Sequence, residues 1–309
     1  MTSAVLREIG ARLRGEVRFN ESLAGYTTYH IGGPAAALVF PASVDDVVAV
    51  LTLAAEMGMP WIALGLGSNV LVSDRGFDGV VIRLGRGLDQ VKVGVGGEEW
   101  VWRVGAGFAT PQLARRTARA GLSGVNRLVG VPGTVGGGVF MNAGAHGQEY
   151  AKVVQSVDLV DGDGTVRTVS ASDVPWRYRA SGLDGMVVTA ATVTLAPADP
   201  ATLREHVRKD LAWRKTATPF AERCCGSVFR NPPAVVPGEE PWSAGRLIDS
   251  LGLKGLRVGG AVVSELHANY IVNTGGATAS DVLKVIEQVR GRVRRECGVE
   301  LELEVRVID

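Results

Sequence analysis

The feature that most constrains the fold is a glycine-rich segment at residues 130–147, which reads GVPGTVGGGVFMNAGAHG. Pro132 stiffens its start, whereas Gly133, Gly136 and Gly137 leave the backbone without side chains. Such a stretch costs conformational entropy on folding and packs little by itself. We therefore expect a large, flat ligand that carries phosphates to approach this backbone closely. A merely flexible loop is the alternative, and the apolar residues within the segment weigh against it.

A second glycine-containing turn, GLGSN at residues 65–69, follows the apolar run WIALGL. Turns of this kind point backbone N–H groups inward and can bind an anion such as a pyrophosphate. A plain β-turn is the alternative. The pairs Gly65/Gly67, 85/87 and 105/107 each supply the first two glycines of a Rossmann fingerprint, but none has the third. The sequence therefore argues against a classical dinucleotide fold.

Size and composition restrict the class of protein. A chain of 309 residues favours two domains, or one domain with a large insertion. With 46% hydrophobic and 21% charged residues it is typical of soluble globular proteins, and no apolar run is long enough to span a membrane. The first 17 residues lack the apolar centre of a signal peptide, so we expect a cytoplasmic location. A net charge of +1 with scattered basic residues argues against nucleic-acid binding.

The cysteines and histidines predict neither disulfides nor a metal. Cys224 and Cys225 are adjacent and Cys297 is remote, which fits neither a disulfide framework nor zinc-ligand spacing. No histidine and carboxylate lie at metal-binding helical spacing. A reducing compartment is the simpler interpretation.

Hydrophobic periodicity and turn signals predict the secondary structure. A strand, helix, strand unit is expected over residues 26–84, with Ser43 as N-cap. A strand at 99–107 precedes a helix with Thr110 as N-cap and Gly121 at its stop. Further expected elements are a hairpin at 161–164, a connector helix at 198–219, a helix at 243–255, a strand at 259–273, a capped helix from Thr278 to Gly298 and a half-buried strand at 299–309.

Eight motifs then occur in a fixed order along the chain: TTYHIGG, GLGSNVLVSD, GVPGTVGGGVFMNAGA, YRAS, GSVFRNP, AGRLIDSLGLKG, SELHANYIVN and LELEVRVI. Together they closely resemble the UDP-N-acetylenolpyruvoylglucosamine reductase (MurB) family of peptidoglycan precursor synthesis. The resemblance covers nearly the whole chain. Each motif alone is weak, but eight in register are very specific.

The resemblance implies an α+β fold with two domains. The first is a FAD-binding domain of the vanillyl-alcohol-oxidase type at residues 1–206, built of two α+β subdomains at 1–88 and 89–206. The second is a smaller α+β substrate-binding domain at 207–298, and the strand 299–309 is expected to return near the active site.

The resemblance also implies the chemistry. In the family, NADPH reduces noncovalently bound FAD, and the flavin then delivers hydride to the enolpyruvyl ether of UDP-N-acetylglucosamine enolpyruvate. The product is UDP-N-acetylmuramate, and NADPH and the sugar nucleotide use one site in turn. The expected partners are therefore this substrate and NADPH, without nucleic acid or membrane, for a monomer. Another flavoprotein oxidase with the same cofactor fold and a binding module without catalysis are the alternatives.

Matching the family's motifs residue by residue gives the expected site. Arg179 in YRAS would stabilise the developing negative charge, with Glu304 in LELEV as the second candidate for that role, and Ser227 in GSVFRNP would donate a proton. Without the resemblance, Glu304 reads as one charge on an alternating edge strand. The expected FAD-binding residues are Gly65, Gly67, Ser68, Asn69, Gly130, Pro132, Gly133, Gly136, Gly137, Asn142 and Ala143. The expected substrate-binding residues are Tyr178, Lys215, Arg230 and Asn231.

Three features depart from the usual family pattern. His30 stands where arginine or lysine is more common. A histidine near FAD could form a covalent link to the flavin, but we expect noncovalent binding, because the family binds FAD noncovalently. Cys224 and Cys225 replace small residues, so either oxidation-sensitive thiols or inert buried ones remain open. The chain passes from YRAS directly into MVVTAATVTL through a short connection, and so resembles the shorter subgroup, which lacks a tyrosine-bearing insertion.

Overall fold

The computed structural model describes residues 10, 12–233 and 242–309. In the first 17 residues, charged and apolar residues alternate in a pattern that predicts a helix, and most of this segment lies outside the described residues. The chain divides into two compact units. Unit 1 comprises Met1–Glu21, Ala35–Leu66 and Asp78–Ala212, and unit 2 comprises Ser22–Pro34, Gly67–Phe77 and Trp213–Asp309. Two short stretches from the first quarter of the chain therefore belong to the C-terminal unit.

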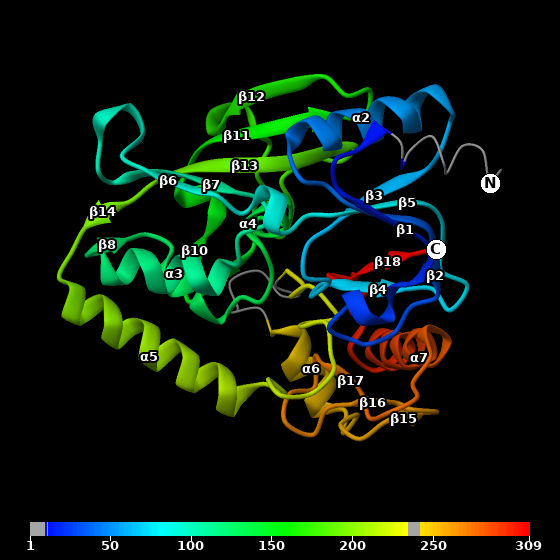
Figure 1. The fold of residues 1–309 in the computed structure, drawn as a ribbon. Coiled ribbons are helices and arrows are strands. Elements are labelled where there is room, and N and C mark those ends of the chain that lie inside the picture. The colour runs from blue at the N-terminus through cyan, green and yellow to red at the C-terminus, as the bar shows by residue number, and fades with distance from the viewer. Residues whose placement is uncertain (1–9, 11, 234–241) are drawn as a thin grey trace. The chain divides into compact units, whose positions relative to one another are not determined.

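The first sheet of unit 1 has the strand order β1-β2-β5-β3 (Figure 1). Its strands are β1 (Glu16–Ser22), β2 (Pro34–Phe40), β5 (Phe77–Arg83) and β3 (Trp61–Leu64), and β3 runs parallel to β5. Helix α2 (Val44–Glu56) connects β2 to β3 and buries one face in the same core as the strands. The predicted strand, helix, strand unit is confirmed.

The second sheet of unit 1 has the order β12-β11-β13-β7-β6 and its neighbouring strands are antiparallel. It consists of β6 (Val91–Val93), β7 (Val101–Gly105), β11 (Val154–Asp161), β12 (Val166–Ser170) and β13 (Met186–Thr194). The predicted hairpin joins β11 to β12. Around this sheet lie α3 (Thr110–Arg119), α4 (Val135–Phe140), α5 (Pro200–Ala217) and the short pairs β8 (Leu122–Ser123) with β14 (Ala196–Pro197) and β9 (Gly144–Ala145) with β10 (Gln148–Glu149).

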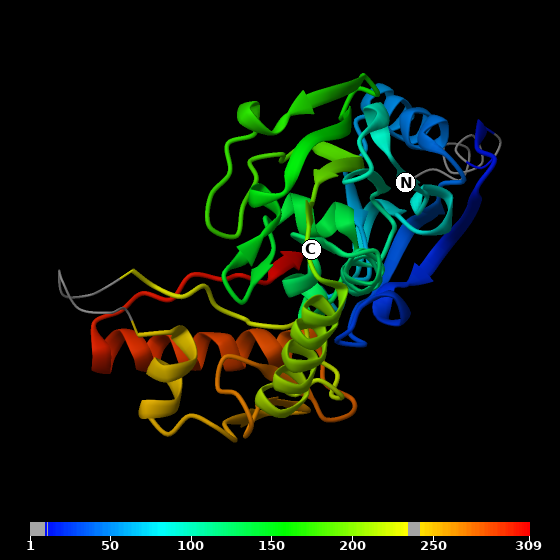
Figure 2. The same cartoon turned by 90° about the vertical axis from the view of Figure 1, so that its left-hand side faces the viewer.

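Unit 2 has its own core around helix α7 (Ala279–Cys297), which Figure 2 shows lengthwise with the C-terminal chain leaving its end. Its other elements are α6 (Ala244–Ser250), the antiparallel strands β15 (Arg257–Val258), β16 (Ala261–Val263) and β17 (Ile271–Asn273), and the parallel pair β4 (Val70–Val72) with β18 (Arg306–Ile308). The capping box predicted at Thr278 and the stop at Gly298 are both confirmed.

Three local predictions need correction. Ser43 holds the N-cap position of α2 without a side-chain hydrogen bond, because the carboxylate of Asp46 accepts the nearby N–H groups of the preceding loop and the N-terminal segment instead. Thr110 is the first helical residue of α3 rather than its cap, since its hydroxyl pairs with that of Tyr150 at 2.8 Å. The single strand predicted at 259–273 is two strands, β16 and β17, joined by a turn.

The half-buried strand predicted at residues 299–309, in which apolar and charged residues alternate, is confirmed only in part. Val299, Leu301 and Val305 are buried while the glutamates between them are exposed or half-buried, as expected. Within this segment, regular strand structure is confined to β18, because the preceding residues form one isolated bridge, Leu303 with Phe229, rather than a continuous ladder. The boundaries 1–206, 207–298 and 299–309 stay a prediction. Helix α5 contributes residues to both units.

Candidate active site

The glycine-rich segment forms a short helix, α4, rather than an irregular loop. Its glycines face two ways. A Cβ on Gly136 would lie 2.7 Å from the Cβ of Ala106, and one on Gly138 would lie 2.3 Å from the ring of Tyr150. Gly137 is exposed, and the nearest atom to a Cβ there is the hydroxyl of its own N-cap residue at 3.6 Å. Two glycines are therefore required by internal packing, and only the exposed side leaves room for a ligand.

Gly65 belongs to the same surface of unit 1. A Cβ on Gly65 would lie 2.5 Å from Oγ1 of Thr134, whose hydroxyl caps α4 by accepting the N–H of Gly137. Gly133, next to this cap, has a φ of +125°, a conformation that L side chains rarely adopt. Gly65, Gly133 and Gly137 thus bring side-chain-free backbone together at the start of α4. A flat, phosphate-bearing group such as FAD fits against backbone of this kind.

Buried polar side chains join this segment to the YRAS loop. Asn142 is 2% exposed, donates from Nδ2 to the carbonyl of Arg177 at 3.0 Å, and accepts the N–H of Ala151 at 3.0 Å. Ser181 Oγ donates to the carbonyl of Phe140 at 2.7 Å. Asn142, expected to contact the cofactor, therefore has a structural role that sequence reasoning did not foresee. It holds two loops of the site in register.

Arg179 is held in an unusual backbone conformation. Its φ of +56° lies in the left-handed region, which costs energy for a residue with a side chain and is common at functional sites. Its guanidinium donates to the carbonyl of Gly144 at 3.0 Å and stands 5.0 Å from the ring centroid of Tyr178. The tyrosine ring is half exposed. The side chain predicted to stabilise charge is therefore fixed at the end of the glycine-rich segment in unit 1.

Ser227 and Glu304 lie on paired segments of unit 2. The N–H of Glu304 donates to the carbonyl of Val228 at 2.8 Å, and the N–H of Arg230 donates to the carbonyl of Glu302 at 2.9 Å. Ser227 is half-buried and precedes this pairing. Two of the three predicted catalytic residues are thus brought together by backbone hydrogen bonds, although about 75 positions separate them in sequence, a separation that loop-closure entropy tolerates.

Asn269 fixes the chain that follows Ser227. Its side chain accepts the N–H of Phe229 at 2.9 Å and donates to the carbonyl of the same residue at 2.8 Å. Its own carbonyl accepts the N–H of Val228 at 2.9 Å. Sequence reasoning missed this residue, and the available signal was an amide side chain inside the apolar run HANYIVN. A buried amide is stable there because both of its polar atoms are hydrogen-bonded.

The second half of the turn at 65–69 belongs to unit 2. Gly67 has a φ of +64°, and a Cβ there would lie 2.2 Å from the carbonyl oxygen of Tyr26, so only glycine fits. Asn69 donates from Nδ2 to the carbonyl of Glu304 at 3.0 Å, and its own carbonyl accepts the N–H of Arg306 at 3.0 Å. The amide of Asn69 therefore anchors the C-terminal segment, and any contact with a pyrophosphate stays a prediction for this residue and for Ser68.

The predicted substrate-binding residues come from both units. Arg230 forms an ion pair with Glu302 at 3.7 Å. Asn231 accepts the N–H of Ala244 at 3.1 Å and so supports the start of α6. Lys215 is exposed on α5 in unit 2, while Tyr178 belongs to unit 1. Arg230 and Asn231 have polar partners within unit 2, and the Tyr178 ring contacts the guanidinium of Arg179 in unit 1.

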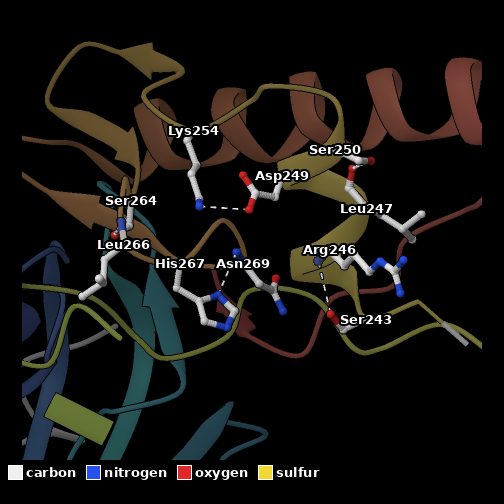
Figure 3. Close-up of polar contacts among 10 residues, drawn as sticks. All are labelled: Ser243, Arg246, Leu247, Asp249, Ser250, Lys254, Ser264, Leu266, His267 and Asn269. Carbon is white, nitrogen blue, oxygen red and sulfur yellow. Dashed lines mark hydrogen bonds and ion pairs between the residues drawn. The ribbon is translucent and has the colours of Figure 1, made fainter. Parts of the chain in front are cut away.

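Burial governs the thiols and the histidine near Ser227. It raises the pKa of the Cys225 and Cys224 thiols, which disfavours the reactive thiolate. Burial, followed by the charges of Arg214 and Lys254, lowers the pKa of His267. Its Nδ1 accepts the N–H of Asn269 at 3.2 Å (Figure 3), so the neutral ring carries its proton on Nε2. This agrees with the structural role expected for His267.

Residues 10, 12–233 and 242–309 include no helix that combines the length and apolar character needed to cross a membrane. The same residues hold no group of three or more His, Cys, Asp and Glu side chains that could bind a metal ion.

Two regions of the chain match known protein families. Residues 35–170 match the FAD binding domain family, and residues 218–308 match the C-terminal domain of UDP-N-acetylenolpyruvoylglucosamine reductase. A reductase of that name from Rubrobacter xylanophilus is 46% identical over 300 residues, which are 96% of this chain and 97% of the relative. The chain belongs to the UDP-N-acetylenolpyruvoylglucosamine reductase family. The family resemblance inferred from the eight motifs is confirmed.

Further members agree with this assignment. The reductase from Bacillus subtilis is 38% identical over 307 residues, which are 98% of each chain. The crystal structure of UDP-N-acetylenolpyruvylglucosamine reductase (MurB) from Thermus caldophilus is similar with a TM-score of 0.79 and 36% identity, covering 96% of this chain and all of that one. The predicted α+β fold with a FAD-binding domain of the vanillyl-alcohol-oxidase type is confirmed. The oxidase alternative is less supported, because the C-terminal domain matches the reductase family.

Proposed function

We propose that this chain catalyses the NADPH-dependent reduction of UDP-N-acetylglucosamine enolpyruvate to UDP-N-acetylmuramate. The observation that carries the proposal is the match of both the FAD-binding and the C-terminal regions to reductases of one family over nearly the full chain. The pairing of the Ser227 and Glu304 segments in unit 2 supports it, since it joins the segments that carry the proposed proton donor and a second proposed site residue.

We assign FAD binding to the surface at the start of α4 and to the neighbouring turn. Gly65, Gly133 and Gly137 supply side-chain-free backbone there, which is the condition for close approach of a flat ring and its phosphates. When bound, FAD takes hydride from NADPH and supplies it to the terminal carbon of the enolpyruvyl group. The proposed set further includes Gly67, Ser68, Asn69, Gly130, Pro132, Gly136, Asn142 and Ala143.

The chain's own residues deal with the charge and the proton. Hydride addition leaves negative charge at the carbon that bears the carboxylate. The guanidinium of Arg179 stays protonated and can bind a carboxylate through two hydrogen bonds, so we assign charge stabilisation to it. Ser227 donates its hydroxyl proton to that carbon, because a strongly basic carbanion needs only a well-placed donor. Glu304 lies on the segment that pairs with the Ser227 segment, and we assign to it the second role in stabilising the developing charge.

We assign the nucleotide portion of the substrate to Tyr178, Lys215, Arg230 and Asn231. Lysine and arginine are suited to a diphosphate because they donate charged hydrogen bonds to its oxygens. We also propose that the protein acts as a monomer in the cytoplasm, where NADPH and UDP-sugars are available. Light scattering should then give a mass near 32.5 kDa.

Replacement of Ser227 by alanine tests the proposed acid. In Ser227→Ala, flavin reduction by NADPH should remain within about twofold of wild type, and reoxidation by the enolpyruvyl substrate should slow by about 10²–10⁴-fold. Stopped-flow absorbance under anaerobic conditions measures both rate constants. Ser250→Ala, which removes an exposed hydroxyl on α6, is the matched control. Equal slowing of both half-reactions would refute the role of Ser227 as proton donor.

A further inference from the structure

Asp210 is a buried carboxylate on a helix whose other polar residues are exposed or half-buried. Helix α5 is described over its whole length, and its buried residues are Leu203 and Asp210. The aspartate is 5% exposed. Aspartate is rarely buried to this extent unless its charge is paired, because burial removes the water that stabilises a carboxylate. The groups that Asp210 faces therefore decide its role, and sequence reasoning assigned it none.

A guanidinium and an imidazole lie beside this carboxylate. Oδ2 of Asp210 is 3.2 Å from Nε of Arg127, and Oδ1 is 3.8 Å from Nδ1 of His146. No donor among the described residues completes a hydrogen bond to Oδ2, so the charge of Arg127 compensates this buried oxygen. Arg127 belongs to the 3-10 helix η4 (Asn126–Gly130), and His146 lies near the end of the glycine-rich segment. One carboxylate thus lies beside residues at both ends of that segment.

His146 is at the tip of a small hairpin. Strands β9 and β10 are antiparallel, and His146 and Gly147 join them. These two residues have φ values of +51° and +77°, as a two-residue type I′ turn requires. A histidine in this left-handed conformation is uncommon, because its Cβ makes the conformation costly. Nζ of Lys152 donates to the carbonyl of Gly147 at 2.6 Å, so polar side chains flank the tip on the lysine side as well as at Asp210.

The base of the same hairpin holds the guanidinium of Arg179. Its Nη2 donates to the carbonyl of Gly144, the first residue of β9, at 3.0 Å. A Cβ on Gly144 would lie 3.1 Å from Nη1 of Arg179 and 2.6 Å from the carbonyl oxygen of Gln148. Because Gly144 has no side chain, the guanidinium and the opposite strand can both approach its backbone. A shift of the hairpin tip would therefore also move the carbonyl to which Arg179 is bonded.

We propose that Asp210 is a positioning residue: held by Arg127, it fixes the hairpin tip at His146 and thereby keeps the guanidinium of Arg179 in its orientation. This inference rests on the proposed function, in which Arg179 stabilises the charge that hydride addition leaves on the substrate. All four residues belong to unit 1, and η4 packs against both β9 and β10. A buried ion pair often adds little net stability, so a role in geometry accounts better for this one.

The substitution Asp210→Asn tests the proposal because it removes the charge and keeps the shape of the side chain. Anaerobic reoxidation of the flavin by the enolpyruvyl substrate should slow by about 10-fold, since a displaced guanidinium stabilises the developing charge less well. Reduction by NADPH should stay within about twofold, which also shows that the variant is folded and binds FAD. Reoxidation of Asp210→Asn at the wild-type rate would overturn the proposal.

Glu205→Gln is the matched control. It neutralises a more exposed carboxylate of the same helix, which pairs with Arg208 at 2.8 Å. Ion pairs of this exposed kind contribute little, so both half-reactions should stay within about twofold of wild type. An equal slowing of reoxidation in Glu205→Gln and Asp210→Asn would overturn the specific role of Asp210.

A double-mutant cycle separates action through Arg179 from a general effect on the fold. The reoxidation rate constant is measured for wild type, Asp210→Asn, Arg179→Ala and the double variant. If Asp210 acts through the guanidinium, its replacement has no further effect once the guanidinium is absent. The double variant should then reoxidise within about twofold of Arg179→Ala. A further 10-fold loss, of about the size seen in the wild-type background, would overturn the proposal because Asp210 would act independently of Arg179.

The substitution His146→Asn tests the hairpin tip itself. Asparagine tolerates the left-handed conformation, so the turn is kept while the imidazole is lost. Reoxidation should slow by about 3- to 10-fold, and reduction by NADPH should stay within about twofold. An unchanged reoxidation rate would overturn the path through His146.

Failure of the inference is distinguishable from failure of the proposed function. If the proposed function is wrong, the enolpyruvyl substrate does not reoxidise the wild-type flavin at all. If only the positioning role is wrong, wild type reoxidises rapidly, and Asp210→Asn either does so equally fast or loses the same factor with and without Arg179.

Discussion

At the scale of single residues, two buried asparagines determine how the site loops are held. Asn142 fixes the loop that carries Arg179, and Asn269 fixes the chain after Ser227. Both side chains are hydrogen-bonded to backbone groups far away in sequence. The chemistry of a site can therefore depend on residues that touch neither cofactor nor substrate.

Replacing Asn269 should destabilise unit 2. In Asn269→Leu the N–H and carbonyl of Phe229 lose their partners inside the core. Buried groups left unsatisfied cost about 1–3 kcal/mol each, so we expect the free energy of unfolding to fall by about 2–4 kcal/mol in urea. Gln288→Ala, an exposed change on α7, should alter it by less than about 0.5 kcal/mol. If Asn269→Leu lowers the free energy of unfolding no more than this control does, the stabilising role of the Asn269 side chain is contradicted.

Residue types in a motif could be predicted to be important, but not which atoms they contact. Arg179, Ser227 and Glu304 were identified from local matches to family motifs. The amide of Asn69 was expected at a pyrophosphate, and the structure shows it bonded to the backbone of Glu304. Such a contact depends on how distant segments meet, which local sequence does not encode.

At the scale of elements, local signals predicted what depends on neighbours in the chain. The capping box at Thr278 and the glycine that ends α7 were recognised because every interacting group lies within a few residues. Ser43 was correctly predicted at the N-cap position of α2, but its side chain makes no capping hydrogen bond. The contacts of Asp46 with the N–H groups of Arg14 and Gly15 could not be predicted, because they join segments about thirty residues apart.

The start of α7 should respond to pH through Asp74. Burial is the largest single influence and raises the pKa of this carboxyl, but the hydrogen bonds from Ser280 and Ala279 together outweigh it, so the pKa is lowered. A lowered folded pKa contributes stability that is present above the unfolded value of about 3.9 and is lost as pH falls through the folded value.

Replacing Asp74 by asparagine measures this contribution. The free energy of unfolding of Asp74→Asn should be about 0.5–2 kcal/mol below wild type at pH 7, as for loss of a helix-capping side chain. The difference should shrink as pH falls below about 4. Urea titrations from pH 3 to 7 test this, with Glu287→Gln on the exposed face of α7 as control. A difference in unfolding free energy that stays constant over this pH range would contradict the stabilising role of the ionised Asp74 carboxylate.

The two faces of α4 give a matched pair of substitutions. In Gly138→Ala the new methyl would lie 2.3 Å from the Tyr150 ring, so overpacking should lower the free energy of unfolding by about 1–3 kcal/mol. In Gly137→Ala the methyl makes only an ordinary contact, 3.6 Å from the Thr134 hydroxyl, so stability should change by less than about 1 kcal/mol while FAD binds more weakly. Urea unfolding and flavin fluorescence measure these effects. Similar losses of stability in both variants would contradict the two-faced arrangement.

At the scale of the whole molecule, the chain order did not reveal how the units are composed. Length and motif order predicted two domains and an α+β fold. That Ser22–Pro34 and Gly67–Phe77 belong with Trp213–Asp309 could not be predicted, because it follows from pairings such as β4 with β18 across more than two hundred residues. Family resemblance supplied the function, since the fold alone would also suit other flavoenzymes.

The most direct test of the proposed function is an anaerobic absorbance experiment on the wild-type protein. The flavin spectrum is recorded, the bands are bleached with NADPH, and UDP-N-acetylglucosamine enolpyruvate is then added. Our account predicts rapid return of the oxidised bands with formation of UDP-N-acetylmuramate. A flavin that stays bleached with this substrate and returns only when oxygen is admitted would contradict it.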